Sequence, residues 1–111
     1  MTTLFEKIIA GEIPSQKLFE NDRIIAIKDI NPAAPVHILI IPKKVIPNIQ
    51  SLAEDDLPLV AEIVKVAQQL ALDVGIQDNY RLVTNCGVDA GQTIFHLHFH
   101  LVGGRKLHGL G

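Results

Sequence analysis

The sequence predicts one α+β domain, residues 1–111, in which a small antiparallel sheet is covered by helices. Three observations predict this fold class. A chain of 111 residues buries roughly two-thirds of its unfolded surface, which allows one hydrophobic core but not a second. Only 5% of the residues are aromatic and none is Trp, so Ile, Leu and Val must build that core, a composition that favours a helix packed on a sheet. The spacing of these apolar residues also changes along the chain from strand-like to helix-like.

The N-terminal third reads as a short helix followed by three strands. Thr3 and Glu6 have the spacing of a capping box, and the apolar residues behind them stop at Gly11, which predicts a helix over residues 3–10. The next segments are rich in Ile, Leu and Phe, and turn residues separate them. They predict antiparallel strands over residues 16–20, 23–28 and 36–41.

One long helix and two further strands follow. From Asp55 to Gly75 the apolar residues recur at helical spacing, and Pro58 fits the first turn, where a missing N–H costs nothing. Asp55 or Asp56 can cap this helix. The apolar positions that define it are Leu59, Ile63, Val66, Leu70 and Val74. Strands are predicted over residues 80–85 and 94–102, joined by the Gly-containing segment 86–91.

Charge and composition exclude several classes of protein. Ten Lys and Arg against 12 Asp and Glu give a formal charge of −2, without the basic patch that a phosphate backbone requires, so we expect no nucleic-acid partner. No apolar run approaches the ~20 residues of a membrane span, so we expect no membrane contact. The single cysteine, Cys86, allows no intrachain disulfide, which indicates a reducing compartment and therefore a cytoplasmic protein.

The segment from His96 to Val102 carries the strongest chemical signal. The two-residue period of a strand places His96, His98 and His100 on one face and three apolar side chains on the other. Such imidazoles can ligate Zn²⁺ or can act as nucleophile and proton donors, and the spacing does not choose between them. The preceding Gly91-Gln92-Thr93 offers an amide, a hydroxyl and backbone N–H groups, which suit phosphate oxygens better than a metal.

The same segment matches the His-φ-His-φ-His-φ-φ signature, with φ apolar, and so resembles the histidine-triad (HIT) superfamily of nucleotidyl hydrolases and transferases. Residues 4–14, 29–44 and 91–105 are similar to the HINT branch, the purine nucleoside phosphoramidases. The resemblance covers nearly the whole chain. It implies a five-stranded antiparallel sheet with one short and one long helix, and a homodimer whose two sheets form a continuous ten-stranded sheet.

The resemblance also implies a reaction that needs no metal or other cofactor. His98 would attack the α-phosphorus of an adenosine or guanosine 5′-phosphoramidate, and water would hydrolyse the resulting nucleotidyl-histidine. His100 would bind a non-bridging phosphoryl oxygen, while His96 and His37 would orient the other imidazoles. Thr93, which stands where the family usually has Ser, would relay a proton to the leaving amine.

A second set of residues would bind the purine ribonucleotide. Asp29 would accept hydrogen bonds from both ribose hydroxyls, and Asn85 would bond the ribose or the phosphate. Gly91 and Gln92, with Thr93, would donate to the phosphate. The base pocket would be lined by four apolar side chains, which are Phe5, Ile8, Ile27 and Ile30.

Several rival functions stay open at this point. A dinucleoside polyphosphate hydrolase belongs to another branch, whose sequence after the triad differs from Gly103-Gly104-Arg105. A nucleotide-binding interaction module with incidental hydrolysis and a zinc-binding protein are the alternatives from other classes. The uridylyltransferase branch is disfavoured because a Gln replaces the third histidine there, where this chain has His100. For Arg105 itself we expect a surface ion pair, and the tail 107–111 departs from the Trp-Pro-Pro-Gly ending of eukaryotic relatives.

Overall fold

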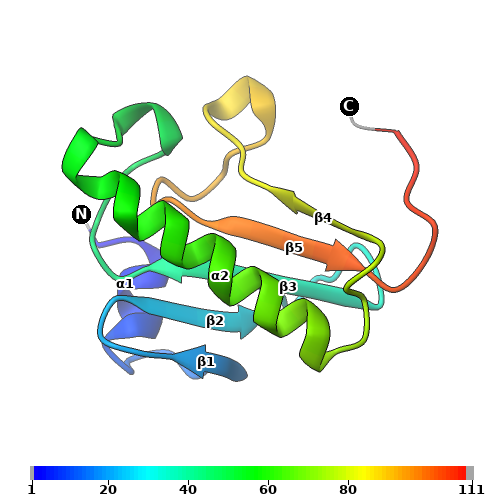
Figure 1. Ribbon diagram of the computed structural model, residues 1–111. Coiled ribbons are helices and arrows are strands. Elements are labelled where there is room, and N and C mark those ends of the chain that lie inside the picture. Colours follow the sequence, from blue (N-terminus) through cyan, green and yellow to red (C-terminus); the bar gives the residue numbers. More distant parts are fainter. Residues whose placement is uncertain (1, 110–111) are drawn as a thin grey trace.

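The computed structural model describes residues 2–109, so residues 1, 110 and 111 of the predicted domain lie outside that range. A five-stranded antiparallel sheet forms its centre, with strand order β1-β2-β3-β5-β4 (Figure 1). The strands are β1 (Lys17–Glu20), β2 (Ile24–Lys28), β3 (Val36–Pro42), β4 (Tyr80–Val83) and β5 (Phe99–Gly103). No helix within residues 2–109 is long and apolar enough to cross a membrane.

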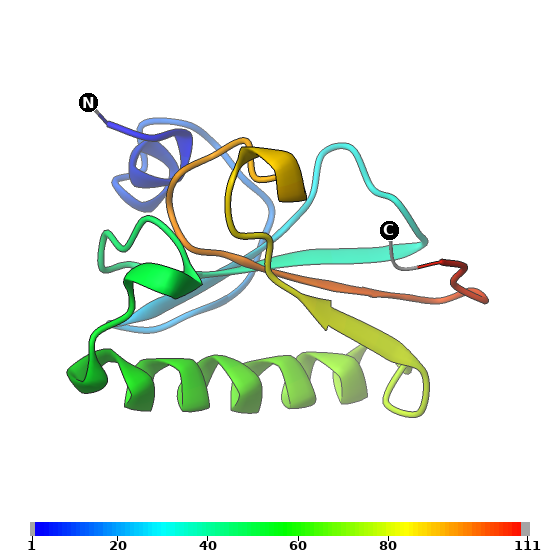
Figure 2. The same cartoon turned by 90° about the horizontal axis from the view of Figure 1, so that it is seen from above.

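The two helices cover opposite faces of the sheet, as Figure 2 shows. Alternation along β3 supplies both cores: Ile38 and Ile40 pack with the long helix α2 (Leu57–Asp73), while Leu39 and Ile41 pack with the short helix α1 (Leu4–Ile9). The predicted α+β architecture of five antiparallel strands, one short helix and one long helix is therefore confirmed.

The two helices begin differently. At α1 the predicted capping box is present, because the Glu6 N–H donates to Thr3 Oγ1 at 3.2 Å and the Thr3 N–H donates to Glu6 Oε1 at 3.0 Å. At α2 a single 3-10 turn, Glu54–Asp56, leads into the helix. Asp56 occupies the N-cap position without capping, since its carboxylate accepts from Lys44 Nζ and from the Ala53 N–H instead.

The strand predicted over residues 94–102 is wrong in its first half, because β5 begins only at Phe99. The segment 94–98 is bound to the end of β3 and to the chain that follows it, rather than to β4. The His96 ring bonds the Pro42 carbonyl at 2.7 Å, and the Leu97 N–H donates to the Ile46 carbonyl at 2.6 Å. Leu97 still enters the α2-side core, so the alternating pattern persists in extended chain that has no strand partner.

Two smaller differences have the same origin. β4 ends at Val83 rather than at residue 85, because Val83 pairs with His100 and the partner strand begins one residue earlier, at Phe99. The connecting segments contain 3-10 turns that the sequence pattern did not predict, at Ile49–Ser51, Glu54–Asp56 and Val88–Ala90.

The contact between α2 and the sheet is tested by truncating Ile63, which is 0% exposed. We expect Ile63→Ala to lower the free energy of unfolding by about 2–5 kcal/mol, because it removes apolar contact and leaves a cavity in the core. Lys65→Ala, on the exposed side of the same helix, is the control and should change that free energy by less than about 0.5 kcal/mol. Denaturant titration of both variants measures the difference, and equal stabilities would contradict the packing described here.

Candidate active site

Four histidines meet on the α1 face of the sheet. His37 comes from β3, His100 from β5, and His96 and His98 from the extended segment that leads into β5. In the β3–β5 register Leu39 faces His100 and His37 faces Val102, so His37 and His100 are diagonal neighbours. The ring centroids of His98 and His100 are 5.1 Å apart, and those of His37 and His100 are 5.2 Å apart. The sheet thus gathers all four predicted imidazoles.

His98 presents an unprotonated nitrogen. Its Nδ1 lies 2.7 Å from the carbonyl oxygen of His96, and a carbonyl can only accept, so Nδ1 carries the proton of the neutral ring. The lone pair is then on Nε2. Thr84 Oγ1 donates to the His98 carbonyl at 2.7 Å and holds the backbone of the same residue. Phe5 packs edge-on against the imidazole at a centroid distance of 4.8 Å, which restricts the ring orientation.

His96 ties this segment to the end of β3. Its ring is fully buried, and Nε2 donates to the Pro42 carbonyl at 2.7 Å. The other nitrogen, Nδ1, has no hydrogen-bond partner within residues 2–109. His96 therefore holds the backbone whose carbonyl fixes His98.

His37 and His100 form a second hydrogen-bonded pair. The Ala33 N–H donates to His37 Nδ1 at 2.9 Å, so the proton of neutral His37 is on Nε2. That nitrogen lies 2.9 Å from His100 Nδ1, which must accept, so the proton of neutral His100 is on its own Nε2. His98 therefore offers a lone pair at Nε2, and His100, two residues later, offers an N–H at its own Nε2.

Burial keeps both of these rings neutral. It lowers the pKa of His98 below the ordinary 6.5, against the bond to the His96 carbonyl, which acts in the opposite direction. Burial, and then the neighbouring His98 and His37, lower the pKa of His100 to about 4. At neutral pH the site therefore holds a neutral nucleophile beside a neutral hydrogen-bond donor.

The residues predicted to bind phosphate and ribose are placed as follows. Asp29 follows β2; its Oδ1 accepts from the Asn31 N–H at 2.8 Å, and its Oδ2 lies 3.4 Å from His37 Nε2. Asn85 lies near Gly91, because a Cβ on that glycine would be 3.7 Å from Asn85 Nδ2. Thr93 is exposed in the segment between the last 3-10 turn and His96.

Gln92 differs from its prediction as a phosphate donor. Its side chain donates to the carbonyls of Pro47 and Ile94 and accepts from the Gly87 N–H. Its own backbone N–H donates to the Gly87 carbonyl at 3.0 Å, and the Gly91 N–H donates to Val88. Neither predicted residue has a free backbone N–H for phosphate, because these groups shape the loop before the histidines.

The predicted base pocket is only partly open. Phe5, at 2% exposed, packs in the α1-side core together with Ile8 and Ile27. Ile30, in the loop after β2, is 89% exposed. Phe5 contacts His98 and Ile30 is free to contact a ligand, while the base-binding role of all four residues stays a prediction.

A metal site does not fit this hydrogen bonding. One ligand atom from each of Asp29, His37 and His100 lies within 4.8 Å of the others. A histidine ligand must offer an unprotonated nitrogen to the metal. His37 offers none at Nε2, because the Ala33 N–H occupies Nδ1 and keeps the proton on Nε2. His37 Nε2 is instead hydrogen-bonded to His100 Nδ1 at 2.9 Å, and Asp29 Oδ2 lies 3.4 Å from the same nitrogen.

Sequence reasoning missed two backbone groups that fix the tautomers. They are the Ala33 N–H and the carbonyl of Pro42. Every residue except proline carries a backbone N–H, and every residue carries a carbonyl, so no residue type marks them. The hydroxyl of Thr84 was also missed, since Thr is an ordinary strand residue.

The neutral state of the two imidazoles can be measured directly by NMR titration of the histidine rings. We expect His100 to protonate near pH 4 and His98 below pH 6.5, because burial penalises the imidazolium. The free energy of unfolding should fall as the pH decreases from 6.5, because the unfolded chain takes up protons that the folded site refuses. A His100 that titrates at the value it has in the urea-unfolded chain would contradict this description.

Comparisons with known proteins agree with this arrangement. Residues 2–109 match the family described as scavenger mRNA decapping enzyme C-term binding. A HIT-like protein of Chlamydia pneumoniae is 54% identical over 105 residues, which are 95% of this chain and 96% of that one. A HIT family hydrolase from Clostridium thermocellum has 51% identity and a TM-score of 0.94, covering 98% of this chain and 96% of that one. A histidine triad nucleotide-binding protein from Candida albicans has 31% identity and a TM-score of 0.81 over 99% and 86% of the two chains. With four histidines gathered on its sheet and relatives of this similarity, the chain belongs to the histidine-triad (HIT) family.

Proposed function

We propose that this protein hydrolyses the P–N bond of purine nucleoside 5′-phosphoramidates, such as adenosine 5′-phosphoramidate, through a covalent nucleotidyl-histidine. The observation that carries this proposal is a pair of hydrogen bonds that assign opposite tautomers to two neighbouring imidazoles. His98 offers the Nε2 lone pair and His100 the Nε2 proton, two residues apart on one face. The name of the C. thermocellum hydrolase supports a hydrolytic reaction, and that of the C. albicans nucleotide-binding protein supports a nucleotide ligand.

The reaction proceeds by two displacements at phosphorus. In the first, His98 Nε2 attacks the α-phosphorus, a new N–P bond forms, and the bond to the leaving amine breaks with its electron pair going to the amine nitrogen. That nitrogen takes a proton, for which the exposed Thr93 hydroxyl is the proposed relay. In the second, water attacks phosphorus and loses a proton, which replaces the one that the relay gave to the amine. The N–P bond breaks with its electron pair returning to His98 Nε2, and the nucleoside monophosphate is released.

His100 supplies the electrostatic part of catalysis. As negative charge grows on the non-bridging oxygens, its Nε2–H donates a hydrogen bond to one of them. The pKa of about 4 makes this group a neutral donor at pH 7. Because His37 Nε2 donates to the opposite nitrogen of the ring, the donor already points outward before substrate arrives.

Recognition of the nucleotide uses the loop after β2. Asp29 Oδ1 accepts one backbone N–H and Oδ2 lies 3.4 Å from His37, which leaves further lone pairs on both oxygens for the ribose hydroxyls. The exposed Ile30, in the same loop, is the proposed contact to the base. Asn85, beside Gly91, is the proposed contact to the ribose or the phosphate.

A homodimer is the proposed assembly. Helix α2 exposes Leu57 at 54%, Val64 at 40% and Leu72 at 56%, and their spacing places them along one side of the helix. β4 is the last strand of the sheet, and its outer edge has backbone groups available to a second β4 (Figure 1). Pairing two such edges would bury both apolar stripes and produce a ten-stranded sheet.

The dimer is tested by sedimentation of the parent protein and of Val64→Glu at micromolar concentration. We expect the parent to sediment as a dimer and Val64→Glu as a folded monomer, because a carboxylate cannot be buried unpaired in an apolar interface. Lys7→Glu, on the exposed side of α1 and on the opposite face of the sheet, is the control and should remain dimeric. A monomeric parent would contradict the proposed assembly.

The reaction is tested by amine release from adenosine 5′-phosphoramidate, with and without a metal chelator. We expect the parent to turn over equally in both, and His98→Ala to lose more than about 10³-fold in kcat/KM, because the nucleophile is removed. His98→Ala should still bind AMP. His108→Ala, an exposed histidine in the tail, is the control and should behave like the parent.

Three outcomes would overturn the proposal. Chelator-sensitive turnover would indicate a metal enzyme. Turnover that depends on His98 but strongly prefers dinucleoside polyphosphates would assign the chain to that substrate class. Nucleotide binding without hydrolysis by the parent would indicate an interaction module.

A further inference from the structure

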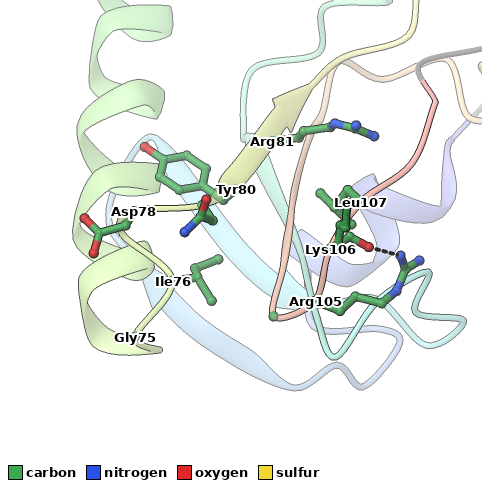
Figure 3. Close-up of a pocket in the computed structure, with 10 residues that line it drawn as sticks. Gly75, Ile76, Asp78, Tyr80, Arg81, Arg105, Lys106 and Leu107 are labelled. Atoms are coloured by element: carbon green, nitrogen blue, oxygen red, sulfur yellow. Dashed lines mark hydrogen bonds between the residues drawn. The ribbon is translucent and has the colours of Figure 1, made fainter.

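Arg105, just after β5, has an unexpected set of partners. The predicted ion pair is wrong, because across residues 2–109 no carboxylate lies within 4.0 Å of its guanidinium. Its Nη2 donates to the carbonyl of Ala33 at 2.8 Å, and its Nη1 donates to the carbonyl of Lys106, also at 2.8 Å. Figure 3 shows Arg105 and its bond to Lys106 at a cavity of about 780 Å³, which lies at the end of β5 remote from His98.

Ala33 is the residue that connects Arg105 to the histidines. Its carbonyl accepts from Arg105, and its N–H donates to His37 Nδ1. It belongs to the loop of residues 29–35, which is otherwise mostly exposed, with Ile30 at 89%. The carbonyl of the exposed Ala33 is therefore bonded to Arg105, and its N–H is bonded to the imidazole of His37.

The neighbouring glycine brings the two segments together. Gly104 has φ +94°, and a Cβ there would lie 3.0 Å from Pro35 Cβ and 3.4 Å from the Val36 nitrogen. A side chain at this position would push the chain after β5 away from the loop. The Gly104-Arg105 pair is thus built to approach residues 29–35 closely and then to bond them.

A continuous path runs from Arg105 to the reacting face. The links are Arg105 to Ala33 at 2.8 Å, Ala33 to His37 at 2.9 Å and His37 to His100 at 2.9 Å. We propose that Arg105 is a positioning residue of the active site: by holding Ala33 it keeps His37 in the Nε2–H tautomer, on which the outward Nε2–H of His100 depends. The kinetic part of this inference rests on the proposed function, while the tautomer part does not.

The physical reason is that His37 has no fixed tautomer once the hydrogen bond from the Ala33 N–H is removed. If the Ala33 N–H moves away, the proton of neutral His37 is free to occupy Nδ1. The Nε2 lone pair of His37 would then face His100 Nδ1, so either their hydrogen bond is lost or His100 moves its own proton to Nδ1 to donate it. His100 would no longer be held with its proton toward the phosphate. Asp29, in the same loop and 3.4 Å from His37 Nε2, would lose its fixed position too.

The guanidinium is suited to this task for geometric reasons. It bridges two carbonyls at once with a rigid planar fork, whereas a lysine ammonium is a single point donor on a flexible stem. Arg105→Lys keeps the charge and removes the fork. Lys106→Ala removes a neighbouring exposed charge and leaves the backbone carbonyl in place, which makes it the matched control.

The test combines two measurements on Arg105→Ala, Arg105→Lys, Lys106→Ala and the parent. Nitrogen-15 NMR of the histidine rings in the free protein at pH 7 reports which nitrogen of His37 and of His100 carries the proton. Steady-state kinetics with adenosine 5′-phosphoramidate reports kcat and KM. We expect a single Nε2–H tautomer of His37 in the parent and in Lys106→Ala, and a mixture of tautomers in both Arg105 variants. In those two variants kcat should fall about tenfold, the scale for losing an outer hydrogen-bond partner.

Two results would overturn the inference. One is an Arg105→Lys protein with the parent's tautomers and kcat, which would show that only the charge matters. The other is a Lys106→Ala protein whose kcat falls as far as that of Arg105→Ala, which would also show that only the positive charge in this segment matters. If Arg105→Ala does not fold, Arg105→Lys carries the test. If the parent has no turnover the proposed function fails, and the NMR measurement still decides the role of Arg105.

Discussion

The hydrogen bond from His98 Nδ1 to the His96 carbonyl is the interaction on which the reactivity of this site depends. It joins a side chain to the backbone two residues earlier, at 2.7 Å, and it requires the intervening chain to be extended but free of a strand partner. Three anchors provide this: the His96 ring on Pro42, the Leu97 N–H on Ile46, and the Thr84 hydroxyl on the His98 carbonyl. The late start of β5 is therefore part of the site, because it leaves the His96 carbonyl available to an imidazole.

The hydrophobic core and the site both depend on the alternation of side chains along residues 96–101. Leu97, Phe99 and Leu101 pack beneath α2, and the histidines between them are directed to the α1 face. Core packing on one face thus positions the imidazoles on the other, with Phe5 of α1 closing over His98 at a centroid distance of 4.8 Å. The same burial lowers the pKa values of His98 and His100, so the packing also sets their charge.

The features that could be predicted from sequence are those that a residue type marks. Thr3 and Glu6 mark the start of α1, and the two-residue alternation around His98 marks its face. The features that could not be predicted depend on backbone groups, which no residue type identifies. The Ala33 N–H and the Pro42 carbonyl are important because they meet the rings of His37 and His96, and the residue types at positions 33 and 42 do not indicate this. Gln92 was expected to reach phosphate because its amide can donate, yet its amide nitrogen already donates to the carbonyls of Pro47 and Ile94.

Long-range placement also explains the arginine after β5. A cation in an exposed tail is ordinarily paired with a carboxylate, but Arg105 instead meets backbone carbonyls and so reaches the loop that contains Asp29. The loop after β2, the end of β3 and the chain after β5 thereby form one connected support around His37. We interpret the site as a pair of fixed neutral imidazoles whose tautomers are determined largely by backbone hydrogen bonds.

The most direct test of this account is to identify the residue that carries the nucleotide during turnover. The parent protein is mixed with excess adenosine 5′-phosphoramidate, denatured at alkaline pH within the first turnovers, digested, and its peptides are weighed and fragmented. We predict one nucleotidyl group on the peptide that contains residues 94–102, with fragmentation assigning it to His98. A nucleotidyl group on His100, on His96 or on Cys86 would contradict the account, which assigns the accessible nucleophilic lone pair to His98 Nε2. His100 Nδ1 accepts from His37, and the His96 ring is fully buried.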